Sequence, residues 1–156
     1  LAEKGFDFAF IAFNTFLHLL NHEEEIDCLH RIHKHLRTKG GLAIDVFQLD
    51  PRRPEGVLRL SHAVKIPQSG VELVRYYQQS MDYAEQLMKV NYVYEVSENG
   101  VGRTFATNYR LRILLRGELE LLLDKAGFQV VSVFGSFEIE QQSTTSEKII
   151  ILAEKR

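Results

Sequence analysis

The chain has 156 residues, of which 45% are hydrophobic and 26% charged, and its formal net charge is −2. This is the length of one domain with enough apolar residues for a buried core. The 19 basic residues against 21 acidic ones exclude the strong basic excess of a protein that binds nucleic acid or an anionic membrane. The single cysteine, Cys28, excludes an intramolecular disulfide and a cysteine-built metal site. No apolar run approaches the ~20 residues of a membrane span, and we expect a cytoplasmic protein.

The first residues are unusual for a complete protein. The chain begins with Leu1 instead of Met and soon becomes strongly apolar, so we interpret it as the later, truncated part of something longer. The run 6–13, FDFAFIAF, is apolar except for Asp7. Such a short, continuous apolar run is typical of a buried strand in a parallel sheet, although its periodicity does not exclude a buried helix.

The segment from Asn21 to Leu36 has the signals of an amphipathic helix. Asn21 is a suitable N-cap, and the three glutamates that follow suit the amino end of a helix dipole. Basic residues gather toward the other end, and Gly40-Gly41 is expected to stop the helix. The apolar stripe at helical spacing comprises Ile26, Leu29, Ile32 and Leu36.

A second apolar run, 42–47 (LAIDVF), follows the glycine pair and contains one acid, Asp45. Strand, helix and strand in this order predict a βαβ unit. The strands 6–13 and 42–47 should therefore be parallel, with a right-handed crossover.

The pattern changes after residue 54, where four segments alternate apolar and polar residues with period two. Turn signals at 67–70 and 97–100 predict hairpins between them. In the fourth segment Tyr109 and Leu111 alternate with Arg110 and Arg112. We expect an antiparallel meander with one dry and one wet face. The four segments are 57–66, 71–81, 86–96 and 103–115.

The end of the chain returns to helix and strand. Residues 117–126 predict a second helix, with Gly127 as its carboxyl-terminal cap. Residues 129–137 and 148–153 predict two closing strands. We expect a single domain over 1–156, in which 1–50 and 116–156 form the core and 55–115 form an antiparallel insertion.

Four segments follow one another in a characteristic order: FDFAFIAFNTFLHLL, HLRTKGGLAIDVF, LRGELELLLDKAGFQVVSVFGSF and SEKIIILAEK. Together they resemble the carboxyl-terminal portion of class I S-adenosylmethionine-dependent methyltransferases. In that family they resemble the fourth strand, the crossover helix with the fifth strand, the late helix with the sixth strand, and an antiparallel seventh strand. The resemblance implies an α/β fold, a partial Rossmann-like (doubly wound) methyltransferase sheet carrying an antiparallel β insertion.

The resemblance implies a parent enzyme with S-adenosylmethionine as cofactor and the amine or hydroxyl of a small molecule as acceptor. The family's Gly-rich cofactor loop and ribose-binding acid have no match in this sequence, so we expect the chain alone to be inactive. A different hypothesis stays open, in which the chain is a non-catalytic binding or dimerisation module derived from that fold. In either case the strand 6–13 would have an unpaired edge, which predicts a homodimer through it.

Four residues of the first half are candidates for the site. Phe13 and Asn14 end the first strand, and ligands of open α/β sheets bind at the carboxyl ends of strands, so they are the candidate cofactor contacts; the alternative is a packed aromatic and a turn-forming amide. His18 lies beside the active site by resemblance, as a base or substrate ligand, or is a structural histidine. Asp45 lies in an apolar strand, and its carboxylate either binds a substrate amine or pairs with a neighbouring backbone group or arginine.

Tyr109 and Arg112 are the candidate substrate-binding residues, with a solvated strand face as the alternative for the arginine. We expect no metal site. His30 and His33 lie about 60° apart on the predicted helix, but no carboxylate ligand accompanies them, so they are interpreted as surface residues.

Overall fold

A computed structural model describes residues 5–98 and 100–156. The chain divides into two compact units, a core unit of Leu1–Asp50 with Arg112–Arg156 and a meander unit of Pro51–Leu111. Neither described α-helix is long and apolar enough to cross a membrane. The elements in chain order are β1 (Phe6–Ile11), η1 (Thr15–His18), α1 (His22–His35), β2 (Leu36–Phe47), β3 (Arg59–Ile66), β4 (Val71–Asp82), β5 (Leu87–Glu98), β6 (Val101–Arg112), α2 (Arg116–Lys125), β7 (Phe128–Phe134) and β8 (Lys148–Lys155).

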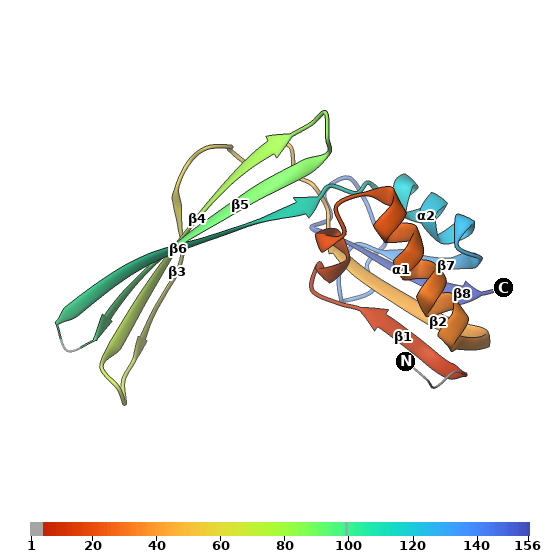
Figure 1. Cartoon of the computed structure of the whole chain (residues 1–156), viewed down its shortest axis with the longest axis horizontal. Helices are drawn as coiled ribbons and strands as arrows, with labels where there is room; N and C mark the ends of the chain where they lie inside the picture. The colour runs from red at the N-terminus through yellow and green to blue at the C-terminus, as the bar shows by residue number, and fades with distance from the viewer. Residues whose placement is uncertain (1–4, 99) are drawn as a thin grey trace. The chain divides into compact units, whose positions relative to one another are not determined.

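The core sheet has the strand order β1-β2-β8-β7 (Figure 1). β1 and β2 are parallel, which confirms the predicted βαβ unit, and β8 is antiparallel to both of its neighbours. The expectation of an α/β sheet closed by an antiparallel last strand is therefore confirmed. Because β1 and β2 run parallel, their carboxyl ends lie at the same edge of the sheet, where open α/β sheets bind ligands.

The first strand pairs as predicted but is not buried. β1 ends at Ile11, two residues before Phe13, and the exposed fractions of Phe6, Phe8 and Phe10 are 38%, 55% and 73%. The reason is its place at the edge of the sheet, with β2 as its sole neighbour among the described strands. A continuous apolar run does not distinguish an edge strand from a central one.

The prediction that Gly40-Gly41 ends the first helix is wrong. α1 ends at His35 and both glycines lie inside β2, so the basic residues Arg37 and Lys39 are also strand residues. A Cβ on Gly40 would lie 3.2 Å from the backbone carbonyl of Phe6 in β1, and one on Gly41 would lie 2.6 Å from the Phe8 ring. The glycines therefore allow β1 to approach β2 closely, and they do not cap the helix.

Other predicted helix ends are confirmed. The Asn21 side chain accepts a hydrogen bond from the backbone N–H of Glu24 (2.9 Å), and Gly127 has φ 88° at the end of α2. At the end of α1 the expected basic residue Lys34 lies in the last turn, and Lys155 of β8 adds a further charge by donating to the carbonyls of His33 and Leu36 (2.6 and 2.8 Å). The fully buried core includes Leu29, Leu42, Ile44, Val46, Leu119, Leu123, Phe128, Ile149 and Ile151.

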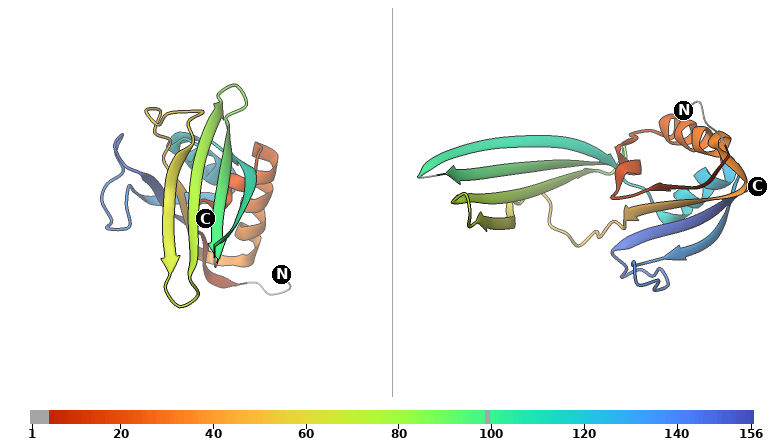
Figure 2. Two further views of the ribbon diagram at one scale, coloured as in Figure 1. Left: turned by 90° about the vertical axis from the view of Figure 1, so that its left-hand side faces the viewer. Right: turned by 90° about the horizontal axis from the view of Figure 1, so that it is seen from below.

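The meander unit is a four-stranded sheet in the order β3-β4-β5-β6, and the β3–β4 and β4–β5 pairs are antiparallel. β4 and β5 run side by side along most of their length (Figure 2). The predicted meander is thus present, although the turn expected at 97–100 includes Asn99, which lies outside the described residues. The dry-face prediction is wrong for the outer strands, because β3 is exposed throughout and β6 from residue 101 to 108.

The end of β6 also departs from the predicted alternation. The strand ends at Arg112, whereas the sequence predicted it to continue to Leu115. Arg112 is buried together with Leu111 and Ile113, while Leu115 is 55% exposed. Arg112 belongs to the core unit, and its burial has a cause in that unit, described below. The expectation of a single domain stays a prediction.

Candidate functional site

The chain turns sharply at the carboxyl end of β1. Phe13 and Asn14 have φ values of 56° and 62°, in the left-handed region that non-glycine residues rarely adopt. Three hydrogen bonds to β2 hold this corner: Phe13 N–H to Oδ2 of Asp45 (3.2 Å), Asn14 N–H to the Asp45 carbonyl (3.1 Å), and Phe47 N–H to Oδ1 of Asn14 (2.6 Å). The surrounding strand therefore imposes the unusual backbone conformation.

Asp45 joins the corner to a third strand. Its side chain is buried, and its Oδ1 lies 2.8 Å from Nζ of Lys148 at the start of β8. A buried carboxylate needs such partners because its desolvation is costly. The sequence left open a pairing with backbone or arginine; the structure shows a backbone partner and a lysine. Whether Asp45 also acts on a substrate stays a prediction.

The corner leaves an aromatic side chain in solvent. Phe13 is 85% exposed, although its backbone is fixed by Asp45. The structure thus brings Phe13, Asn14 and Asp45 together at the predicted edge of the sheet. An exposed ring on a fixed backbone can contact a flat or cationic ligand without reorganisation.

His18 ends the short helical turn η1, which follows the corner directly. The turn begins with the Leu17 N–H donating to the Asn14 carbonyl (3.0 Å), and Phe16 and Leu17 are each only 1% exposed. These two buried side chains anchor the turn, while His18 is exposed. The candidate base therefore lies on the surface four residues from Asn14, on a segment that packing holds in place.

A charged cluster that the sequence did not predict lies at the start of α1. The Glu25 carboxylate is fully buried, its Oε2 lies 2.8 Å from Nδ1 of His22, and its Oε1 lies 3.8 Å from Nε of Arg112. Nη2 of Arg112 lies 3.2 Å from Nε2 of the same histidine. Burial raises the pKa of Glu25, and His22 and Arg112 partly oppose this shift. One signal was present, because Glu25 lies four residues before Leu29 on the apolar stripe.

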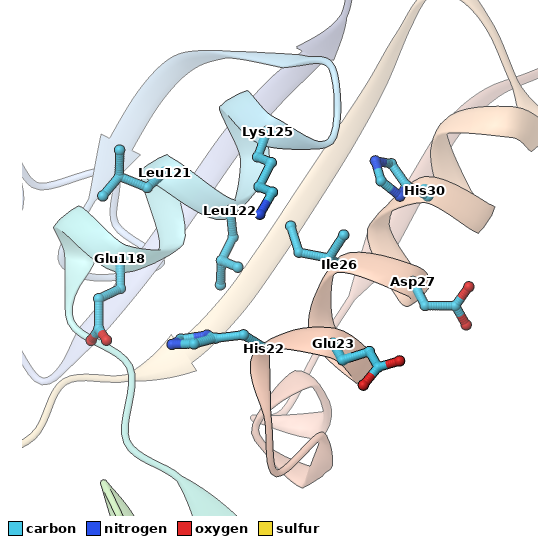
Figure 3. Close-up of a pocket in the computed structure, with 9 residues that line it drawn as sticks. All are labelled: His22, Glu23, Ile26, Asp27, His30, Glu118, Leu121, Leu122 and Lys125. Carbon is cyan, nitrogen blue, oxygen red and sulfur yellow. The ribbon is translucent and has the colours of Figure 1, made fainter.

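A hollow of about 600 Å³ lies between α1 and α2 (Figure 3). Its floor includes Ile26 and Leu122; His22 and Glu118 lie toward one end, and Lys125 lies toward the other. The predicted residues Phe13, Asn14, His18 and Asp45 do not line it. The full lining is His22, Glu23, Ile26, Asp27, His30, Glu118, Leu121, Leu122 and Lys125.

Tyr109 lies in the meander unit, in a cluster of tyrosines. Its ring centroid is 6.0 Å from that of Tyr92, which also lies near Tyr77 and Tyr94. Burial, followed by the hydrogen bond to Tyr92, strongly raises the pKa of Tyr109. The Tyr109 phenol therefore stays neutral well above physiological pH.

The histidines of α1 show no metal-binding arrangement. His33 packs edge-on against Phe128, with ring centroids 5.2 Å apart. In residues 5–98 and 100–156, no three His, Cys, Asp or Glu side chains are grouped so that they could hold a metal ion.

Comparison with known proteins adds the fold context. No family model and no curated protein sequence matches the chain. The CcbJ methyltransferase of Streptomyces caelestis is similar in structure, with 25% identity, a TM-score of 0.79 and coverage of 100% of this chain and 63% of that one. An S-adenosylmethionine-dependent methyltransferase of Clostridium acetobutylicum gives 10% identity, a TM-score of 0.83 and coverage of 97% and 59%. CalS10 of Micromonospora echinaspora, an amino pentose methyltransferase, gives 17% identity, a TM-score of 0.79, and coverage of 100% of this chain and 60% of that one.

The chain spans less than two thirds of the length of each of these proteins. The likeness extends over both the core unit and the meander unit, because it covers nearly the whole of this chain. The chain therefore has the fold of a large part of an S-adenosylmethionine-dependent methyltransferase.

Proposed function

We propose that this chain forms part of an enzyme that transfers a methyl group from S-adenosylmethionine to an amine or hydroxyl of a small molecule. The fixed corner at the end of β1 carries this proposal. Phe13 and Asn14 keep left-handed backbone conformations because Asp45 and Phe47 hold them with hydrogen bonds. Strained conformations that the surroundings enforce are concentrated at ligand-binding and catalytic sites.

The residues at the corner suit the proposed cofactor. S-adenosylmethionine supplies a methyl group on a positively charged sulfonium. The exposed ring of Phe13 offers an aromatic surface that attracts a cation, and Asn14 stands beside it at the ligand-binding edge of the sheet. In this proposal both residues contact the cofactor, and Asp45 holds the corner in shape.

The chain's own part in the reaction is to position the acceptor and to take its proton. With S-adenosylmethionine bound, the acceptor nitrogen or oxygen would receive the methyl group in place of the sulfonium sulfur and would lose a proton to this chain. His18, exposed on the turn after the corner, is the proposed general base. Asp45 is the second proposed catalytic residue, which orients an acceptor amine through its carboxylate.

An amine on a sugar-like acceptor is the form of this proposal that the comparisons favour. Similar structures include an amino pentose methyltransferase, a sugar N-methyltransferase and a glycopeptide N-methyltransferase. Tyr109 and Arg112 are the proposed acceptor-binding residues. A neutral phenol suits a hydroxylated ligand because it offers both an apolar ring and a hydrogen-bond donor.

The remaining cofactor contacts must come from elsewhere. A Gly-rich cofactor loop and a ribose-binding acid are not found in this sequence, and the similar structures are longer than this chain. We propose that the chain alone is inactive and that the complete enzyme supplies those contacts.

A second candidate is a non-catalytic binding or dimerisation module. It is favoured by β1, an edge strand whose Phe8 and Phe10 are exposed. Edge strands of this kind pair readily with another chain. In this form of the proposal two copies associate through β1, and no methyl group is transferred.

One experiment separates the two candidates. S-adenosylmethionine binding is measured by calorimetry on this chain and on the protein encoded by the complete reading frame. Transfer of a labelled methyl group to amino sugars is assayed with both proteins. We expect binding and transfer by the complete protein, none by the chain alone, and loss of transfer in His18→Asn. The control is His62→Asn, an exposed histidine of β3. A complete protein that neither binds the cofactor nor transfers methyl would refute the enzyme proposal.

A further inference from the structure

Glu25 is a charged residue in a position that helix geometry assigns to the core. It precedes Leu29 by four residues, so the two side chains lie on the same face of α1. Leu29 is fully buried, and so is the Glu25 side chain. An apolar residue at this position would simply extend the stripe.

The carboxylate belongs to a closed ring of three side chains. Oε2 of Glu25 accepts from Nδ1 of His22 at 2.8 Å, and Nε2 of His22 lies 3.2 Å from Nη2 of Arg112. Arginine can only donate, so in this contact Nε2 of His22 is the acceptor, and Nδ1 is the donor to Glu25. The third side of the ring is the 3.8 Å separation between Oε1 of Glu25 and Nε of Arg112.

Stability does not explain this arrangement. Oε1 of Glu25 is buried and makes no hydrogen bond within the described part of the chain. A buried ion pair with incomplete hydrogen bonding recovers little of its desolvation cost, and apolar replacements of similar volume are often as stable or more stable. What the ring does provide is a fixed relationship between the segments that carry its members.

Those segments are the ones on which the proposed site depends. Arg112 is the last residue of β6 and the first residue of the core unit after the meander. The start of α1 follows His18 by four residues, and the Leu20 N–H donates to Oε2 of Glu24 (2.9 Å). The Glu25–His22–Arg112 ring therefore links Arg112, at the end of β6, to the start of α1, which follows the proposed base.

We propose that Glu25 is a positioning residue for the proposed methyl transfer, which holds Arg112 in place for the acceptor. This inference rests on the proposed function. Glu25 acts through Arg112 and touches neither cofactor nor acceptor. Its loss therefore changes the KM for the acceptor and leaves the affinity for S-adenosylmethionine unchanged.

The test compares Glu25→Gln, Arg112→Gln and the double variant in the complete protein, with Glu23→Gln as the matched control. Glu23 lies in the same helical turn and is exposed. We expect Glu25→Gln to raise the acceptor KM about tenfold, because small displacements of a positioning group are costly, while the Kd for S-adenosylmethionine changes less than about twofold. The double variant should regain stability, because both charges are gone, but not the KM.

Two kinetic outcomes overturn the inference. One is an unchanged acceptor KM in Glu25→Gln. The other is a double variant that regains KM together with stability, as a purely structural pair would. Amide hydrogen exchange at residues 110–113 separates this inference from the proposed function. If the wild-type protein transfers no methyl group, the function fails, and faster exchange in Glu25→Gln than in Glu23→Gln still supports the positioning contact; equal exchange overturns it.

Discussion

The carboxylate of Asp45 accepts a hydrogen bond from the backbone N–H of Phe13, 32 residues earlier in the chain, at 3.2 Å. The same carboxylate binds Lys148 of β8 at 2.8 Å. One buried side chain thus holds the left-handed corner after β1 and joins three strands of the core sheet. The corner's shape, and with it the proposed cofactor contacts, depends on this residue.

Asp45→Asn separates the two roles of the carboxylate. The amide oxygen can still accept from Phe13, but the charge opposite Lys148 is lost. We expect the free energy of unfolding, measured in urea, to fall by about 1–3 kcal/mol. Asp45→Ala, which also removes the acceptor, should cost more, about 3–5 kcal/mol. Adding Lys148→Met to Asp45→Asn should recover part of the loss, and equal stabilities of all variants would contradict this account.

Gly40 and Gly41 should differ in their tolerance of alanine. A Cβ on Gly41 would meet the Phe8 ring at 2.6 Å, whereas one on Gly40 would meet backbone carbonyls of Arg37 at 2.9 Å and Phe6 at 3.2 Å. The Phe8 ring is 55% exposed and can turn away, but the backbone of two strands cannot. We expect Gly40→Ala to cost about 1–3 kcal/mol and Gly41→Ala less than about 1 kcal/mol. The free energy of unfolding of both variants is measured in urea. A larger loss in Gly41→Ala than in Gly40→Ala would show that the Phe8 ring is the more rigid neighbour.

The glycine pair also shows what the sequence could and could not predict. Asn21 and Gly127 act within their own helices, and both caps were predicted correctly from local signals. Gly40 and Gly41 pack against β1, which lies more than thirty residues earlier in the chain. No local sequence pattern could therefore distinguish a helix stop from a close contact between strands. The antiparallel last strand was expected only because four segments resemble one family.

The candidate site divides in the same way. Phe13, Asn14 and Asp45 lie together because a parallel βαβ unit places strand ends at one edge, and the sequence predicted that unit. The burial of Arg112 beside Glu25 was missed, because period-two alternation placed Arg112 on a wet strand face. Whether a residue at the end of a strand is buried or faces solvent is determined by the residues that pack around it, which period-two alternation does not show.

The stability of the core unit should depend on His33 in mild acid. Burial, followed by the nearby charge of Lys155, lowers the pKa of His33 from its ordinary value of 6.5. The folded protein therefore binds this proton less readily than the unfolded chain, and the stability due to neutral His33 is present above about pH 6.5 and lost as the pH falls through the folded pKa. Urea unfolding between pH 7.5 and 5 should show a steeper loss in the wild type than in His33→Gln. His62→Gln, on exposed β3, is the matched control; an equal loss of stability in the wild type and in His33→Gln would disprove the assignment.

Glu25 predicts the opposite dependence on pH. Its pKa is raised above 4.5, mainly by burial, so the folded protein holds this proton more tightly than the unfolded chain. Its contribution is fully present below about pH 4.5 and is lost as the pH rises through the folded pKa. Glu25→Gln does not titrate here, so its stability relative to the wild type should rise from pH 4.5 to 8. The exposed Glu23→Gln is the matched control, and a constant difference between Glu25→Gln and the wild type would exclude the raised pKa.

The exposed edge of β1 predicts self-association of this chain. Phe10 is 73% exposed on a strand that has one sheet neighbour among the described strands, and a charged residue on an edge strand opposes pairing with a second copy. Light scattering after size exclusion should give a dimer or larger species for the wild-type chain and a lower mass for Phe10→Lys. Val131→Lys is the matched control, because Val131 is 64% exposed on β7, the opposite edge of the same sheet. A monomeric wild-type chain, or an equal effect of Val131→Lys, would show that β1 is not the contact between copies.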